Sequence, residues 1–78
     1  MPKLPLISAI QLAKVLNKMG FELKRQKGSH MFFRHPDGRA TVVPMHSREK
    51  IDTGLLNKII RKDLGIDREQ FLDLFDSI

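Results

Sequence analysis

Histidine is the residue type in this sequence best suited to acid–base chemistry, and one of its three histidines, His30, lies where a predicted turn becomes a strand. The imidazole ring titrates near neutral pH, so histidine can take or give a proton under physiological conditions. A positioned acid–base group typically accelerates a reaction by about 10²–10⁴-fold. The basic residues near it in the sequence are Lys24, Arg25, Lys27 and Arg34. Positive charge around a histidine favours chemistry at a phosphate, where Lys and Arg stabilise the developing negative charge.

RNA is a phosphate substrate for which such a site need not supply a nucleophile, because RNA carries its own, the 2′-hydroxyl. A histidine that moves the proton, with cations around the phosphorus, is enough to cleave it without metal or other cofactor. The alternative is that His30 is an ordinary half-exposed strand residue. A lone histidine does not decide between these interpretations.

The other two histidines are weaker candidates. His35 precedes a proline at a predicted hairpin, where a turn residue is the simpler interpretation. His46 lies in a predicted loop, and both substrate contact and plain exposure fit it. A metal site built from His35, Asp37 and His46 lacks any recognised ligand spacing, so we predict none.

Three neighbours of His30 have two interpretations each. Ser29 has no triad to activate it, so it either caps the turn or hydrogen-bonds a phosphate. Gly28 provides backbone freedom at the turn, or presents amide groups to a phosphate. Phe32 either stacks a base on an open sheet face or packs beneath a third helix or a partner protein.

The length and charge of the chain limit its class. A chain of 78 residues allows one domain, residues 1–78. Without cysteine it can form neither a disulfide nor a cysteine zinc site, and no apolar run approaches 18 residues, so we expect a cytoplasmic protein that is not in a membrane. Residues 1–50 hold ten Lys/Arg against three Asp/Glu, a balance of +7, whereas residues 51–78 have a balance of −2. The basic part suggests a nucleic-acid partner or only a solvated surface.

The elements that position these residues are predicted from periodicity and capping. Ser8 and Gln11 form a capping box before an apolar helical stripe that Gly20 ends. The predicted helices are 9–19, 55–64 after a Thr53 cap, and a short one after Asp67; the predicted strands are 21–26, 30–35 and 40–43. This order, α-β-β-β-α-α, indicates an α+β fold in which a three-stranded antiparallel sheet carries the main helices on one face.

Strand parity decides which side chains are available for chemistry. Three-residue loops at 27–29 and 36–38 would pair Gln26 with His30, Leu23 with Phe33, and Met31 with Val43. The residues expected under the helices are then Phe21, Leu23, Met31, Phe33, Thr41 and Val43. Those expected on the open face are Lys24, Gln26, His30, Phe32, Arg34 and Val42. A one-residue slip at either loop would invert part of this assignment.

The sequence resembles the HicA toxin family over nearly its whole length. The resemblance is carried by Gly28-Ser29-His30, Arg34-His35-Pro36-Asp37-Gly38, Val42-Val43-Pro44-Met45-His46-Ser47, Leu12…Leu16…Met19-Gly20-Phe21 and Gly54-Leu55…Ile59-Ile60…Gly65-Ile66. Members of the family often have Gly-Thr-Leu at the start of the second helix, where this chain has Thr53-Gly54-Leu55.

The resemblance implies a double-stranded-RNA-binding-domain type of fold and an mRNA-cleaving toxin that a cognate antitoxin of the HicB family binds and blocks. It places the family's active-site histidine on His30, with Gly28 and Ser29 in matching positions. We therefore expect a metal-independent endoribonuclease with His30 as general acid or base, supported at the RNA phosphate by Lys24, Lys27, Gly28, Ser29, Arg34 and His46. The competing expectations are a non-catalytic RNA-binding module and a pure protein-interaction domain.

Overall fold

A computed structural model describes residues 3–45 and 49–78 of the chain. Its elements follow the predicted order. They are α1 (Ala9–Met19), β1 (Glu22–Lys27), β2 (His30–Arg34), β3 (Ala40–Pro44), α2 (Thr53–Lys58), the π-helix η1 (Ile59–Leu64) and α3 (Arg68–Asp76). The helices in the described residues are too short and too polar to cross a membrane.

Local capping explains why two of the helices begin where the sequence predicts. At the start of α1, the Ser8 side chain accepts from the backbone N–H of Gln11, and the Gln11 side chain accepts from the N–H of Ser8. Asp67 and Gln70 make the same reciprocal pair before α3. Each box satisfies two backbone donors that a helix start leaves open. The predicted α1 and the predicted short third helix are therefore confirmed.

The second helix differs from the prediction in its cap and in its winding. Its N-cap is Asp52, not Thr53, because the Asp52 carboxylate accepts from the N–H of Leu55 at 3.2 Å. The α-helical turns stop at Lys58, and the wider π-helical turns of η1 continue to Leu64. The C-terminal end of η1 is attached to the loop between β2 and β3, because the Arg39 guanidinium donates to the Leu64 carbonyl at 2.5 Å.

The strands form an antiparallel meander in the order β1-β2-β3. The register of β2 on β3 is as predicted, with His30 opposite Pro44 and Met31 opposite Val43. The ladder continues one residue further, because the Met45 N–H donates to the carbonyl of Ser29. Pro44 therefore belongs to β3, which the sequence predicted to end at residue 43.

The β1–β2 hairpin corrects the predicted loop. Lys27, not Gln26, pairs with His30, so the loop has two residues, Gly28 and Ser29. Gly28 has φ +56°, as the two-residue hairpin turns require at their first position. A bulge between Leu23 and Arg25 then restores the predicted pairing of Leu23 with Phe33. An inserted residue of this kind shifts which side chains face outward beyond it.

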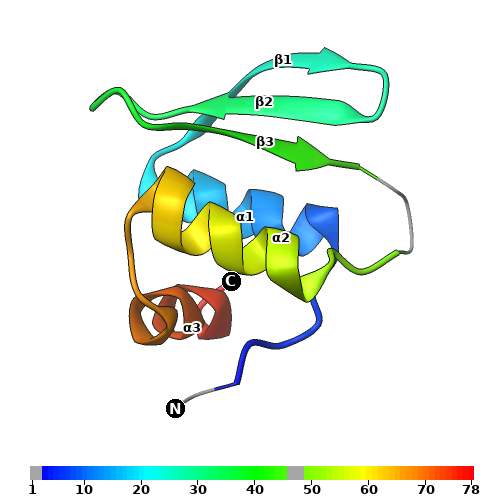
Figure 1. Cartoon of the computed structure of the whole chain (residues 1–78). Helices are drawn as coiled ribbons and strands as arrows, with labels where there is room; N and C mark the ends of the chain where they lie inside the picture. The colour runs from blue at the N-terminus through cyan, green and yellow to red at the C-terminus, as the bar shows by residue number, and fades with distance from the viewer. Residues whose placement is uncertain (1–2, 46–48) are drawn as a thin grey trace.

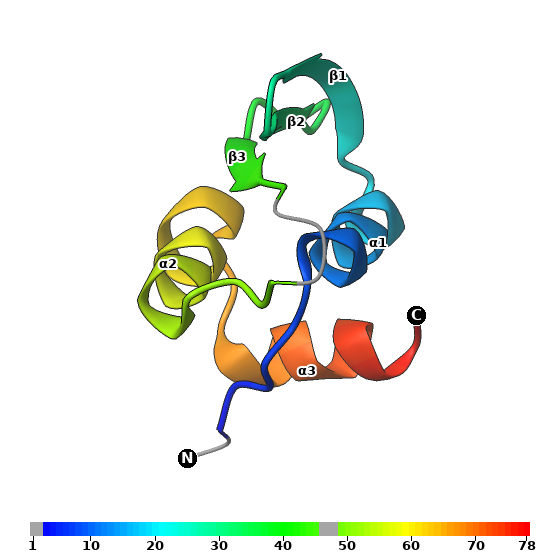
Figure 2. The ribbon, with the colours of Figure 1, turned by 90° about the vertical axis from the view of Figure 1, so that its right-hand side faces the viewer.

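The molecule has three layers, which Figures 1 and 2 show from two directions. The sheet lies on one side, α1 and α2 lie side by side beneath it, and α3 crosses beneath them. Buried apolar side chains fill the space between the layers. They include Leu12, Leu16, Met31, Phe33 and Ile60. The predicted α+β fold, with both main helices on one face of the sheet, is confirmed.

The helices cover β2 and β3 but not β1, because β1 is the strand farthest from them (Figure 1). Every residue of β1 is exposed, and Leu23 retains 47% of its accessible surface. The prediction that Leu23 is buried is therefore wrong, although its pairing with Phe33 is right. The opposite face of the sheet carries no described helix, so its side chains are open to a ligand (Figure 2).

Candidate functional site

The outward side of β2 places three side chains of different chemistry in a row. His30, Phe32 and Arg34 alternate with the buried Met31 and Phe33. Because a strand rises about 3.3 Å per residue, consecutive members of the row are about 6.6 Å apart. The predicted outward direction of these three side chains is confirmed.

His30 is the first residue of β2 and is exposed. Backbone pairing on both sides fixes its position, with Lys27 across the hairpin and Pro44 on β3. The contact from Met45 to the Ser29 carbonyl holds the residue just before it. A backbone fixed in this way presents the imidazole to solvent at a defined place, next to the turn of Gly28 and Ser29.

Two cations on β1 accompany this row: Lys27, which was expected at the phosphate, and Arg25, which was not. Because the hairpin turn has two residues, Arg25 pairs with Phe32 and Lys27 pairs with His30, so these two side chains face outward. Gln26 pairs with the buried Met31, and its predicted place on the open face is wrong. Arg25 was noted as a basic neighbour of His30 but was not expected to contact the substrate, and its guanidinium carbon lies 5.6 Å from the centre of the Phe32 ring.

Lys24 and Arg34 lie further from His30 than Lys27 does. Arg34 pairs with Glu22 and Ala40, at the other end of β2. Lys24 makes an ion pair with Glu22 at 2.7 Å, and this contact lowers the pKa of the Glu22 carboxyl from its ordinary value. The expected group is therefore split: Lys27, Gly28 and Ser29 adjoin His30, whereas Lys24 and Arg34 border a separate hollow. His46 lies outside the described residues.

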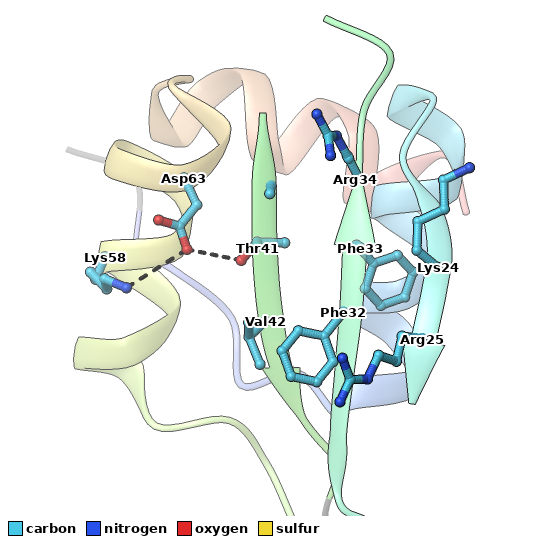
Figure 3. Close-up of a pocket in the computed structure, with 10 residues that line it drawn as sticks. Lys24, Arg25, Phe32, Phe33, Arg34, Thr41, Val42, Lys58 and Asp63 are labelled. Carbon is cyan, nitrogen blue, oxygen red and sulfur yellow. Dashed lines mark hydrogen bonds and ion pairs between the residues drawn. The ribbon is translucent and has the colours of Figure 1, made fainter. Parts of the chain in front are cut away.

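That hollow is a groove of about 620 Å³ on the open side of the sheet (Figure 3). Strands β2 and β3 form its floor, where Phe32 and Val42 lie side by side as a cross-strand pair. Lys24 and Arg25 border it on one side, and Lys58 and Asp63 on the other. His30 does not line the groove but lies on the same face, two residues before Phe32.

The acidic side chain at the groove is already engaged. Thr41 is only 4% exposed, and its hydroxyl donates to the Asp63 carboxylate at 2.9 Å. The same carboxylate oxygen lies 3.8 Å from the ammonium of Lys58 (Figure 3). The negative charge of Asp63 is thus balanced within the protein, and the net charge around the groove is positive.

His35, by contrast, belongs to the scaffold. Its Nε2 lies 3.1 Å from the Met19 carbonyl at the end of α1, and its Nδ1 accepts from the Asp37 N–H at 3.1 Å. The ring also packs edge-on against Phe21, with 5.1 Å between ring centres. The predicted turn position is correct, but the side chain also fastens the β2–β3 hairpin to α1. No group of three or more metal-ligating side chains occurs within residues 3–45 and 49–78.

Comparison with protein families gives a match over most of the chain. The model described as the HicA toxin of bacterial toxin–antitoxin systems covers residues 10–66, from α1 to just beyond η1. The match includes the whole sheet and every described residue of the candidate site, and it leaves α3 outside. A comparison with curated proteins found no match.

Proposed function

Because the chain belongs to the HicA toxin family, we propose that it is the endoribonuclease toxin of a bacterial toxin–antitoxin pair and cleaves mRNA in the cytoplasm. The observation that supports this most directly is the exposed His30, fixed at the start of β2 on a face that also carries Lys27 and Arg25. Family membership supplies the toxin class, and the chemistry of this face supplies the proposed reaction.

The reaction needs one proton-transfer group and a cation at the phosphate. The RNA 2′-hydroxyl attacks the adjacent phosphorus and loses its proton, and the bond to the 5′-oxygen breaks as that oxygen gains a proton. His30 serves as the general acid or base in this exchange. Lys27, its direct cross-strand neighbour, stabilises the negative charge that builds up on the phosphate oxygens. The nucleophile belongs to the substrate, so the proposed reaction is independent of metal.

The partner that follows from the family is a cognate antitoxin, and we propose that it is a protein of the HicB family. Blocking RNA access requires only that such a protein cover the open face, where His30 is exposed. The complex is expected to lose cleavage while the toxin chain remains folded.

A cleavage assay tests the proposal. Wild type and His30→Ala are incubated with a long single-stranded RNA in excess EDTA. We expect wild type to cut and His30→Ala to be slower by about 10²–10⁴-fold with an unchanged fold. His35→Phe is the matched control, because it also removes an imidazole but lies outside the site.

A folded His30→Ala protein that cuts like wild type would overturn the catalytic assignment. If neither protein cuts but both bind RNA in a salt-dependent manner, the chain is a non-catalytic RNA-binding module. That alternative draws on the same positive groove and on Phe32. Absence of RNA binding at moderate salt would instead indicate a protein-interaction domain.

A further inference from the structure

An apolar platform lies in the middle of the positively charged open face. Arg25, Phe32 and Val42 stand directly across β1, β2 and β3 from one another. In Figure 3 the Phe32 ring lies between Val42 on one side and the Arg25 guanidinium on the other. Val42 remains 39% exposed, although both apolar residues belong to regular strands.

This platform is unusual for the solvent side of an antiparallel sheet. Such a sheet normally buries one apolar face and turns polar residues to water, and here Met31, Phe33 and Val43 already fill the buried face. Phe32 and Val42 add nothing to that core, because they point away from it. Their surface is therefore available to a ligand with a flat apolar part.

The charges around the platform indicate what else the ligand carries. Lys24, Arg25, Arg34 and Lys58 border the same groove. The two carboxylates nearby are occupied, Glu22 by Lys24 and Asp63 by Thr41 and Lys58. An aromatic surface bordered by cations is the arrangement that binds single-stranded nucleic acid, because bases stack on the ring while the phosphates meet positive charge.

The distance between Phe32 and His30 indicates which base of the RNA would stack on Phe32. Phe32 is two residues beyond His30 on the same face of β2, about 6.6 Å along the strand. We infer that Phe32 is the stacking platform for the unpaired RNA base next to the bond that His30 cleaves. This inference rests on the proposed function, because His30 marks the position of the cleaved bond only if it is catalytic. It assigns to Phe32 the role of positioning the substrate.

The stacking site also restricts the substrate. A base can lie on Phe32 only if one of its faces is free, and inside a duplex the neighbouring base pairs cover both faces, so the interior of a duplex is excluded from the platform. The large rings of purines cover more of Phe32 and Val42 than pyrimidines do. The site therefore selects single-stranded segments and favours a purine beside the cut.

Binding measured without cleavage tests this inference separately from the proposed function. The His30→Ala protein is titrated into a short fluorescein-labelled single-stranded RNA, and its affinity is compared with that of His30→Ala/Phe32→Leu. Leucine keeps the apolar volume but has no ring. We expect binding about tenfold weaker with leucine, and recovery of most of the affinity with Phe32→Tyr. Leu23→Ala is the control, since Leu23 is exposed on the same sheet but points to the other face.

A second arm changes the RNA while each protein is kept the same, so a difference between two RNAs cannot come from a difference in protein folding. Replacing one nucleotide at a time by an abasic unit should weaken binding to His30→Ala at one position, and should have no further effect at that position with Phe32→Leu. Equal affinities of the phenylalanine and leucine proteins, or equal affinities for intact and abasic RNA, would overturn the inference. So would a Phe32→Leu protein that keeps its RNA affinity and loses only its affinity for the antitoxin. Failure of wild type to cleave would refute the proposed function but leave these binding results interpretable.

Discussion

His35 provides a test of how the sheet is attached to the helices. The change is His35→Ala, which removes a side chain that is four-fifths buried. The alanine protein loses the bond to the Met19 carbonyl and the edge contact with Phe21. Because these contacts join the β2–β3 hairpin to the end of α1, we expect the loss to appear in global stability.

The magnitude follows from the separate contacts. The hydrogen bond to the Met19 carbonyl is worth about 1 kcal/mol. The edge-to-face contact with Phe21 adds about 1 kcal/mol, and the lost burial of the ring adds about 0.5–1 kcal/mol. The free energy of unfolding should therefore fall by about 2–3 kcal/mol. For a chain of 78 residues this lowers the melting temperature by about 10–20 °C.

Circular dichroism melts of wild type, His35→Phe and His35→Ala provide the measurement. Phenylalanine keeps the ring against Phe21 but cannot bond the Met19 carbonyl, so it should lose about 1 kcal/mol and lie between the other two. A His35→Ala melting temperature within about 3 °C of wild type would refute the attachment described above. A well-folded His35→Ala protein that has lost RNA cleavage would show that the two histidines have been assigned the wrong roles.

Two further predictions concern charge. The Arg39 backbone N–H, which Asp37 accepts at 3.0 Å, and the Arg39 guanidinium hold the pKa of Asp37 below its ordinary value of 3.8. The stabilisation from the Asp37 carboxylate is therefore complete above pH 3.8 and is lost as the pH falls through the lower folded-state pKa. In urea titrations, Asp37→Asn should be less stable than wild type at neutral pH and should lose less stability on acidification. Equal pH dependence of the two proteins would contradict this. Glu22→Gln should release Lys24 from its ion pair and tighten RNA binding at low salt. The slope of log affinity against log salt concentration should become steeper by up to about 0.7. An unchanged slope would show that Lys24 does not contact a phosphate.

The parts of the fold that could be predicted from the sequence are those with local causes. The Ser8–Gln11 and Asp67–Gln70 pairs act within four residues, so α1 and α3 begin where they were predicted. The loop after β2 likewise follows from its own residues, since the His35 N–H donates to the Arg39 carbonyl across it. In each case the deciding interactions are between near neighbours in the chain.

The predictions that failed depend on contacts between distant parts of the chain. The two-residue turn and the bulge at Lys24 both lie in a polar run, where apolar alternation gives no signal for register, so the outward direction of Arg25 was not foreseen. The exposure of Leu23 depends on how far the helices extend under the sheet, which strand periodicity does not report. The Asp52 cap is an exception, because its carboxylate bonds Leu55 only three residues on, and Asp52 and Thr53 are both residue types that cap helices.

The core and the candidate site are two sides of one short strand. Met31 and Phe33 are held inward by the helices, and this burial determines that His30, Phe32 and Arg34 point outward at two-residue intervals. A slip of one residue would bury the histidine and expose the core, so the free energy of core packing also enforces the geometry of the site. Since the two-residue turn places Lys27 and Arg25 on this face, the β1–β2 hairpin supplies the charges while β2 supplies the spacing. The chemistry proposed for His30 is therefore positioned by backbone pairing and core burial, and its imidazole stays exposed and accessible to a substrate.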